Sequence, residues 1–321
     1  MVKYSIIIPV YNRPDEVDEL LRSLVKQTFT DFEVLVIEDG SNNRCDSVVD
    51  NYKSKLNISY YFKENSGQGF TRNYGFERAY GEWLIVFDSD CLIPGDYLAI
   101  VDDYIKRHKI DAFGGPDRAH ETFTSVQKAI SYSMTSLFTT GGIRGDKNHI
   151  GVFHPRSFNM GIHKSVFEKT GGYILPRKGE DLEFSIRIIE NGFKTALIED
   201  AFVYHKRRTN FSQFFKQLHF FGTARINVFR HFKSELKLFH FFPSIFLLGI
   251  ATGLFLAILF PILGGIILGF YTLYFLLILI DAGIKTKSIR IAVLSVIASY
   301  ILLTAYGMGF LKEALLYIRK G

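Results

Sequence analysis

The 321-residue sequence contains few of the residues on which disulfide-stapled or zinc-stapled folds depend. Two cysteines are too few for a disulfide framework or a structural zinc site. Eight prolines and 27 glycines follow no G-X-Y period, which excludes a collagen-like chain. With 48% hydrophobic and 22% charged residues, the sequence is not that of a disordered protein, and its length allows one large domain or two ordinary ones.

Several nucleotide and metal motifs are also absent from the sequence. It has no G-x-x-x-x-G-K-[ST] segment, which argues against a P-loop NTPase, and no H-E-x-x-H or C-x-x-C segment that would indicate zinc. The glycine loop 67–69 is not a dinucleotide fingerprint, because Arg72 occupies the third glycine position. A helix start beside an arginine can nevertheless bind phosphate. The beginning, MVKYSIIIPVYN, lacks the long apolar region of a signal peptide.

Positive charge is concentrated in one part of the sequence. The formal net charge is +6, and from His205 to Lys237 there are eight lysines and arginines against one acid, Glu235. This stretch is followed by forty residues without a charged side chain, 241–280. We interpret the basic stretch as a juxtamembrane collar on anionic lipid, so that membrane lipids are expected as partners and nucleic acid is not.

The uncharged C-terminal sequence predicts membrane helices. Forty residues make about 60 Å of helix, twice a hydrocarbon core of about 30 Å. Pro261 near the midpoint predicts a hairpin with spans over about 241–260 and 262–281. A further uncharged run, Ile291 to Leu311, favours a third span over about 290–311, with a partly re-entrant or interfacial helix as the alternative. We therefore expect an N-terminal domain over 1–208, an amphipathic juxtamembrane segment over 209–238 and transmembrane helices over 239–321.

The flanking charges predict the orientation of this segment. Basic residues precede the hairpin at 230–237 and follow it at 285–290, and positive charge marks the cytoplasmic ends of spans. Heavy use of Ile, Phe, Tyr and Lys favours a bacterial source. We expect a multi-pass protein of the bacterial inner membrane with a cytoplasmic N-terminal domain. A third full span would place Lys312, Arg319 and Lys320 outside, against the same charge rule.

The first 205 residues alternate predicted strands and helices. Helices are expected to begin near Pro14, Asp46 and Phe70, and this order predicts an α/β fold with a Rossmann-like, mostly parallel, doubly wound sheet. Ligands bind at the carboxyl ends of such strands. Residues 118–151 allow no clear assignment. The first four predicted strands are Ser5–Val10, Phe32–Ile37, Ile58–Phe62 and Leu84–Phe87.

Two acidic motifs are candidates for chemistry. Asp88 and Asp90, two residues apart at the end of a buried strand, can aim at one cation, and Mg²⁺ or Mn²⁺ prefers such oxygen ligands. Such a pair also occurs in loops by chance. Glu180 and Asp181 begin a predicted helix, where acids either cap the helix dipole or supply a general base.

Six motifs taken together resemble family 2 glycosyltransferases of the GT-A fold, over roughly residues 3–225. The sequence departs from the processive synthases of this family, because 210–226 contains no Q-x-x-R-W element, and this favours transfer of a single sugar. The motifs are PVYNRP at 9–14, EDGS at 38–41, SGQGFTRNYGFERAYGEWLIVFDSD at 66–90, FNMGIHKSVFEKTGGY at 158–173, GEDLEFSIRIIENGFK at 179–194 and VYHKRR at 203–208.

The resemblance implies a role for individual residues. Asp181 would be the catalytic base, and a divalent metal, Mg²⁺ or Mn²⁺, would be held by Asp90, Asp88 and His205, although a structural role for His205 stays open. Residues near the nucleotide sugar would be Pro9, Tyr11, Asp39, Gly67, Arg72, Asp88 and Ser89. Residues near the donor sugar and the acceptor would be Gly114, Gly115, Asn159, Met160, Gly161 and Glu180.

The function implied is that of a membrane-anchored, inverting glycosyltransferase. It would move one sugar from a nucleotide-diphosphate sugar to a hydroxyl of a lipid-linked or envelope glycan, and UDP-sugars are the favoured donors because they are the commonest in the family. One alternative acceptor is polyprenyl phosphate, which is already anionic and needs no base such as Asp181. A nucleotidyltransferase and a catalytically inactive membrane scaffold are the alternatives from other classes.

Overall fold

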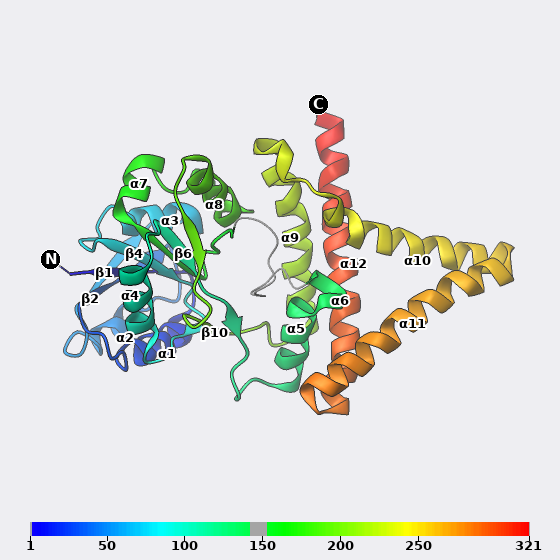
Figure 1. The fold of residues 1–321 in the computed structure, drawn as a ribbon, viewed down its shortest axis with the longest axis horizontal. Helices are drawn as coiled ribbons and strands as arrows, with labels where there is room; N and C mark the ends of the chain where they lie inside the picture. The colour runs from blue at the N-terminus through cyan, green and yellow to red at the C-terminus, as the bar shows by residue number, and fades with distance from the viewer. Residues whose placement is uncertain (1, 142–152, 321) are drawn as a thin grey trace. The chain divides into compact units, whose positions relative to one another are not determined.

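The computed structural model describes residues 2–141 and 153–320, so the last residues of the unassigned stretch 118–151 lie outside the described part (Figure 1). The chain forms two compact units. The first contains the residues up to His120 and, after residue 152, those up to Lys206. The second contains Glu121 to residue 141 and the chain from Arg207 onward.

The first unit is built on a seven-stranded sheet with the order β3-β2-β1-β4-β8-β6-β9. The strands β3, β2, β1 and β4 are parallel neighbours, and β9 is parallel to β6, whereas β8 is antiparallel to both β4 and β6. The predicted mostly parallel α/β sheet is confirmed. The strands are β1 (Tyr4–Val10), β2 (Phe32–Asp39), β3 (Ile58–Lys63), β4 (Trp83–Phe87), β6 (Ala112–Gly114), β8 (Asn159–His163) and β9 (Thr195–Leu197).

Helices cover both faces of this sheet, which explains its continuous apolar strands. In β1, Ile6 belongs to one buried cluster and Ile7 to the other. Val17 packs in the first cluster and Phe76 in the second. A strand buried on both faces reads as an apolar run without alternation. The helices of this unit are α1 (Pro14–Leu24), α2 (Asp46–Asp50), α3 (Gln68–Phe76), α4 (Tyr97–Arg107), α7 (Lys164–Thr170) and α8 (Glu180–Glu190).

A small second sheet lies beside the strand ends, with the order β5-β10-β7. It consists of β5 (Cys91–Leu92), β7 (Asp117–Arg118) and β10 (Val203–His205). The antiparallel register pairs His205 with Cys91, next to Asp90. The sequence predicted a strand near β10, at Ala201–Tyr204, but not this sheet, because β5 and β7 have only two residues each and leave no periodic pattern.

The second unit is helical, and α5 and α6 belong to it (Figure 1). Both fall in the stretch that the sequence left unassigned. Three of its helices, α10, α11 and α12, are long and apolar enough to cross a membrane. The elements are α5 (Ser125–Thr135), α6 (Leu137–Thr140), α9 (Phe211–His231), η1 (Lys233–Glu235), η2 (Leu238–Phe241), α10 (Phe242–Leu259), α11 (Pro261–Thr286) and α12 (Ile289–Lys320).

Candidate active site

The loops that follow β1 and β2 are tied together by Asn12. Its backbone has a positive φ of 55°, and its side-chain Oδ1 accepts hydrogen bonds from Asn42 N and Asn43 N, both at 2.9 Å. Asn12 N donates to Ser41 Oγ at 2.7 Å. On the same segment Pro9 is half-buried in β1, and the Tyr11 ring is 52% exposed. This edge therefore presents an open aromatic surface on a fixed backbone.

Asp39, at the end of β2, fixes the glycine loop. Its carboxylate accepts from Ser66 N at 2.9 Å, from Gly67 N at 3.0 Å and from Lys63 Nζ at 2.6 Å. Burial acts to raise the pKa of Asp39, but Lys63, Ser66 N and Thr71 outweigh it and hold the pKa below its usual value. Gly67 has a φ of +92°, and a Cβ there would lie 2.7 Å from Pro176 O, so only glycine fits.

The turn after β4 holds Asp90 between the side chains of Arg13 and His205. Asp90 Oδ2 lies 2.5 Å from Arg13 Nη1, and Oδ1 lies 3.0 Å from His205 Nε2. Burial acts to raise the pKa of Asp90, but His205 and Arg13 outweigh it and keep the pKa well below its usual range. The His205 ring stacks on Phe158, with centroids 5.1 Å apart. Ser89, within the same turn, is buried.

This cluster fits a divalent metal in part. Ligand atoms of Asp90, Cys91 and His205 lie within 4.8 Å of one another. Asp90 Oδ1 is buried and lies 3.0 Å from His205 Nε2, so a carboxylate oxygen and an imidazole nitrogen, both metal-binding atoms, face the same small space. Burial raises the pKa of the Cys91 thiol, so the O and N donors of Asp90 and His205 are the suitable ligands.

Asp88 takes part in a different contact. Arg72, whose side chain is only 3% exposed, lies between two acids: Nη2 is 2.9 Å from Asp88 Oδ1, and Nη1 is 3.1 Å from Glu180 Oε1. The guanidinium also lies over the Tyr173 ring, 5.4 Å from its centroid. The start of α8 is thereby joined to the turn after β4.

Glu180 and Asp181, adjacent at the start of α8, have different environments. Glu180 is buried and also accepts from Gln68 Nε2. Burial and the charge of Asp181 raise the pKa of Glu180, while Arg72 and Gln68 oppose the rise. The Asp181 carboxylate is 22% exposed and lies 3.0 Å from Arg156 Nε. Asp181 is therefore the acid of the pair that solvent and a substrate can reach.

Three of the residues predicted to line the sugar site, Asn159, Met160 and Gly161, lie in the strand β8. The Asn159 side chain is fully buried: Nδ2 donates to Ala201 O at 2.8 Å, and Oδ1 accepts from Tyr97 Oη. Met160 is fully buried in the second apolar cluster. The described structure gives these two side chains a packing role, and contact with a sugar stays a prediction.

The glycines of this region are required by close packing. A Cβ at Gly161 would lie 2.1 Å from the Phe113 ring. At Gly115 it would lie 1.8 Å from Ala201 O, and at Gly114 it would lie 3.0 Å from the Phe153 ring. The backbone therefore allows no side chain at Gly161 in β8 or at Gly115, the residue directly after β6.

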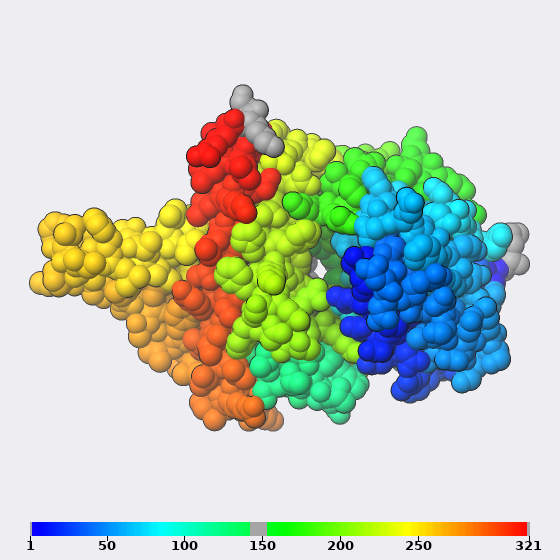
Figure 2. Space-filling model, turned by 180° about the vertical axis from the view of Figure 1, so that it is seen from behind, coloured from blue at the N-terminus to red at the C-terminus, as the bar shows by residue number. Residues whose placement is uncertain are grey.

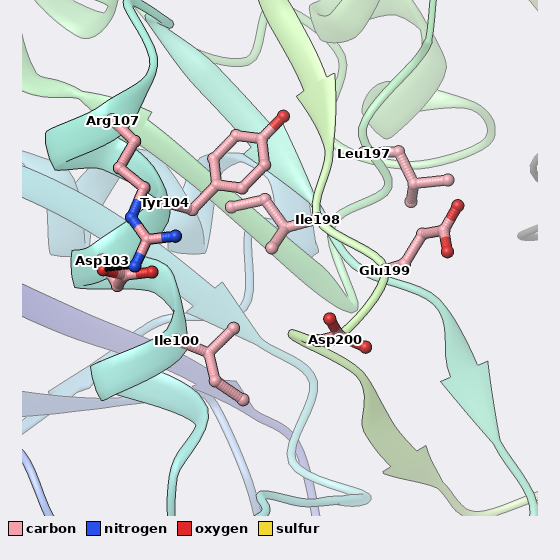
Figure 3. Close-up of a pocket in the computed structure, with 8 residues that line it drawn as sticks. All are labelled: Ile100, Asp103, Tyr104, Arg107, Leu197, Ile198, Glu199 and Asp200. Atoms are coloured by element: carbon pink, nitrogen blue, oxygen red, sulfur yellow. Dashed lines mark ion pairs between the residues drawn. The ribbon is translucent and has the colours of Figure 1, made fainter.

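The first unit also has a surface hollow of about 420 Å³ (Figure 3). It is formed by α4 and by residues 197–200 after β9. Figure 3 shows Asp103 and Arg107 on α4, and these two form an ion pair of 2.7 Å. None of the predicted site residues lines this hollow, so we assign the chemistry to the strand ends instead.

Sequence reasoning missed four residues of this site. Arg13 lies within the PVYNRP motif and Gln68 within the glycine loop, so their positions could have identified them. Tyr173 is the last residue of the motif at 158–173, and its ring lies under the Arg72 guanidinium. Arg156 carried no signal, because its pairing with Asp181 depends on how the strand β8 and the helix α8 pack.

Solved structures show the class of this fold. A mannosyltransferase from Pyrobaculum calidifontis, PcManGT, in complex with GDP-Man and Mn²⁺, matches 98% of this chain and 87% of its own with a TM-score of 0.59 at 16% identity. Staphylococcus aureus TarS 1-349 in complex with UDP-GlcNAc matches 70% of this chain and 67% of its own with a TM-score of 0.51 at 22% identity. The likeness shows a GT-A-like domain followed by long helices.

The sequence comparison gives the family. The profile described as "Glycosyl transferase family 2" matches residues 5–171, more than half of the chain. The chain belongs to this family, as the resemblance of its motifs predicted.

Individual relatives match parts of the sequence. The poly(ribitol-phosphate) β-N-acetylglucosaminyltransferase TarS of Staphylococcus aureus is 37% identical over 115 residues, which are 35% of this chain and 20% of TarS. A glycosyltransferase of Haemophilus influenzae is 28% identical over 221 residues, 65% of this chain and 70% of that protein. The chain thus spans about a fifth of the length of TarS.

Proposed function

We propose that this protein is an inverting glycosyltransferase that transfers one sugar from a nucleotide-diphosphate sugar to a hydroxyl group. The observation that carries the proposal is the contact of Arg72 with both Asp88 and Glu180, because it joins the turn after β4 to the helix that bears Asp181. The nucleotide sugars in complex with the two related proteins, UDP-GlcNAc and GDP-Man, support a donor of this class. UDP-sugars remain the favoured donors.

The reaction is a single displacement at the anomeric carbon. The acceptor oxygen forms a bond to this carbon as the bond to the diphosphate oxygen breaks, and the diphosphate leaves with the electron pair. Asp181 takes the proton of the acceptor hydroxyl, because its carboxylate is the accessible one of the pair. One carboxylate is sufficient for this reaction, which inverts the configuration of the sugar.

The proposed metal is Mg²⁺ or Mn²⁺, held by Asp90 and His205 with Asp88 nearby. Such an ion neutralises the negative charge that develops on a departing diphosphate. Arg13 stays on the second oxygen of Asp90 and fixes the direction of its carboxylate. The Mn²⁺ present with PcManGT supports this choice of ion.

The acceptor we propose is a lipid-linked or envelope glycan. Three long apolar helices support an association with the membrane, which would keep the catalytic unit close to such a lipid. The basic residues on either side of α10 and α11 support a cytoplasmic position for this unit in a bacterial membrane.

A donor screen tests the proposed activity. The full chain, solubilised in detergent, would be incubated with UDP-sugars or GDP-sugars, Mn²⁺ or Mg²⁺ and a bacterial lipid extract, and released nucleoside diphosphate would be measured. We expect release from one donor class, dependent on the extract, and none from the matched variant Asp181→Asn. Release from no donor at all, with extract present, would contradict the proposal.

A further inference from the structure

The helices α10 and α11 form a close antiparallel pair, called the hairpin below. Tyr271 Oη donates to Phe246 O at 3.0 Å near the open end of the hairpin. Nearer the turn, a Cβ on Gly264 would lie 2.2 Å from Ala257 N, so the two backbones are in contact there. The turn itself is Phe260, followed by Pro261 as the first residue of α11.

The surface of the hairpin is apolar on all sides. From Gly253 to Phe270 the sequence contains no polar side chain. Around the turn, Ile258 is 79% exposed, Phe260 60% and Ile262 82%. The 18 residues of α10 measure about 27 Å, close to a hydrocarbon core of about 30 Å. The occupant that fits such a surface is lipid.

Both open ends of the hairpin rest on α12, at different positions along it. At the start of α10, Phe241 packs on Phe310, with ring centroids 5.2 Å apart, and a Cβ on Gly307 would lie 2.5 Å from Pro243 O. At the end of α11, Ala282 packs with Ala292. Gly307 and Ala292 are about 22 Å apart along a helix. The turn of the hairpin lies far from α12 (Figures 1 and 2).

This arrangement differs from a bundle of three crossing helices. The two ends of a hairpin enter a membrane from the same face. Because α12 touches both ends over about 22 Å of its axis, it runs along that face. In a three-span bundle, α12 would instead run back beside α11, and its C-terminal half would lie beside the turn at 260.

The helices α9 and α5, which carry charged side chains, pack against α12. On α9, Leu218 packs in the same cluster as Leu302, and Arg230 Nη2 lies 2.7 Å from Glu313 Oε1. On α5, Ile130 also belongs to this cluster. If α12 crossed the bilayer, α9 would enter with it and carry three cations, each costing about 2.5 to 3.5 kcal/mol at the centre of the core. These cations are Lys216, Arg225 and Arg230.

We infer that α12 lies along the membrane surface with α5 and α9, and that the hairpin alone enters the hydrocarbon from this face. The partner of this surface is a bilayer with anionic headgroups. Basic residues of every segment that flanks the hairpin then share one face, which removes the conflict that a third span creates with the charge rule. They are Lys216, Arg225, Arg230, Lys233, Lys285, Lys287, Arg290, Lys312 and Arg319.

Labelling of single added cysteines tests this topology in the full-length protein. The native Cys45 and Cys91 are fully buried and give little background. Tyr80→Cys, at a side chain 73% exposed, reports the face that carries the catalytic unit. Arg319→Cys reports the end of α12. Membrane vesicles of both orientations would be treated with a membrane-impermeant maleimide.

We expect Tyr80→Cys and Arg319→Cys to be labelled in the same vesicle orientation. Ile318→Cys, at a side chain 73% exposed, repeats the second measurement. Labelling of both α12 positions in the opposite orientation to Tyr80→Cys would overturn the inference. At Gly265, near the turn of the hairpin, a Cβ has no atom within 4 Å, so the side chain of Gly265→Cys fits without a clash. From the membrane face on which Tyr80→Cys is labelled, we expect Gly265→Cys to react only after detergent is added. Labelling from that face in intact vesicles would also overturn it.

Discussion

Asp88 and Glu180, distant in the sequence, are held by the same guanidinium. Arg72 Nη2 lies 2.9 Å from Asp88, and Nη1 lies 3.1 Å from Glu180. The arginine side chain is 3% exposed and the Glu180 side chain 4%, so water does not screen this contact strongly. Through Arg72, the acidic motif at 88–90 and the acidic motif at 180–181 are therefore fixed relative to each other.

The first prediction concerns the stability that depends on Arg72. Arg72→Met leaves a buried acid, Glu180, without its cation, and we expect a loss of about 3 to 5 kcal/mol in the free energy of unfolding. Trp83, the single tryptophan, is buried in β4 and reports unfolding of this unit by fluorescence in urea.

The matched control for this change is Arg107→Met, at an exposed ion pair on α4. Its expected effect is below about 1 kcal/mol. Arg72→Lys should lie between the two, because a single ammonium cannot reach both acids as a planar guanidinium does. Equal urea midpoints for Arg72→Met and Arg107→Met would contradict this role.

The second prediction concerns Asp181 as the base. Asp181→Asn keeps the shape of the side chain but cannot accept the proton, so we expect transfer to fall by about 10²- to 10⁴-fold. Binding of the donor, measured by calorimetry, should change little. A loss of donor binding as large as the loss of transfer would show that Asp181 binds rather than acts as a base.

A third prediction concerns Arg156, which we expect to position the Asp181 carboxylate. Arg156→Gln removes the 3.0 Å contact with Asp181 and should lower kcat by roughly tenfold with little effect on the donor KM. Because the arginine side chain is 38% exposed, the urea midpoint reported by Trp83 should hardly move. Partial recovery of kcat in Arg156→Lys is expected. A change in KM alone would contradict a positioning role.

The fourth prediction concerns the metal. Asp90→Asn removes one charge from the cluster with His205, and we expect at least a tenfold loss in Mn²⁺ affinity, measured by calorimetry or by electron paramagnetic resonance without substrate. Removal of metal by a chelator should stop release of nucleoside diphosphate, and Mn²⁺ should restore it. Unchanged Mn²⁺ affinity in Asp90→Asn would place the ion elsewhere.

The fifth prediction concerns the pH dependence of stability through Asp39. Its pKa in the folded protein is lowered, whereas the pKa of an unfolded aspartate is about 3.9. The stability that this shift contributes is fully present above the unfolded value and is lost as the pH falls through the folded value. The urea midpoint of the wild-type protein should therefore fall more steeply below about pH 4 than that of Asp39→Asn.

At neutral pH the same variant should be less stable by about 1 to 3 kcal/mol, because the backbone donors Ser66 N and Gly67 N lose a charged acceptor. If the urea midpoints of the wild-type protein and Asp39→Asn, measured with Trp83 fluorescence, fell equally steeply below about pH 4, the lowered pKa of Asp39 would be contradicted.

The order of apolar and polar residues in the sequence predicted those strands and helices whose buried side chains follow a regular spacing. Strands such as β1 and β4 are buried on both faces and therefore appear as apolar runs. The antiparallel direction of β8 could not be predicted, because an apolar strand looks the same in both directions. The helix α5 was missed, since Ser131, Ser133 and Thr135 interrupt its apolar positions.

The candidate site shows the same limit. The acids of the motifs could be found by their positions at strand and helix ends. The cations that hold them could not all be found, because Arg13 reaches Asp90 and Arg156 reaches Asp181 only once the chain is folded. Pairs between distant residues leave no trace in the spacing of a single sequence.

The position of α5 in the helical unit limits how this protein can be divided. Tyr132 donates to Asp281 Oδ2 at 2.6 Å, and Met134 packs in the same cluster as Ala298. A fragment cut after residue 208, the natural choice for a soluble enzyme, would keep α5 and discard everything on which it rests. The apolar side chains of α5 would then be exposed to water and favour aggregation of the fragment. The intact chain in detergent is therefore the better choice for crystallisation or screening.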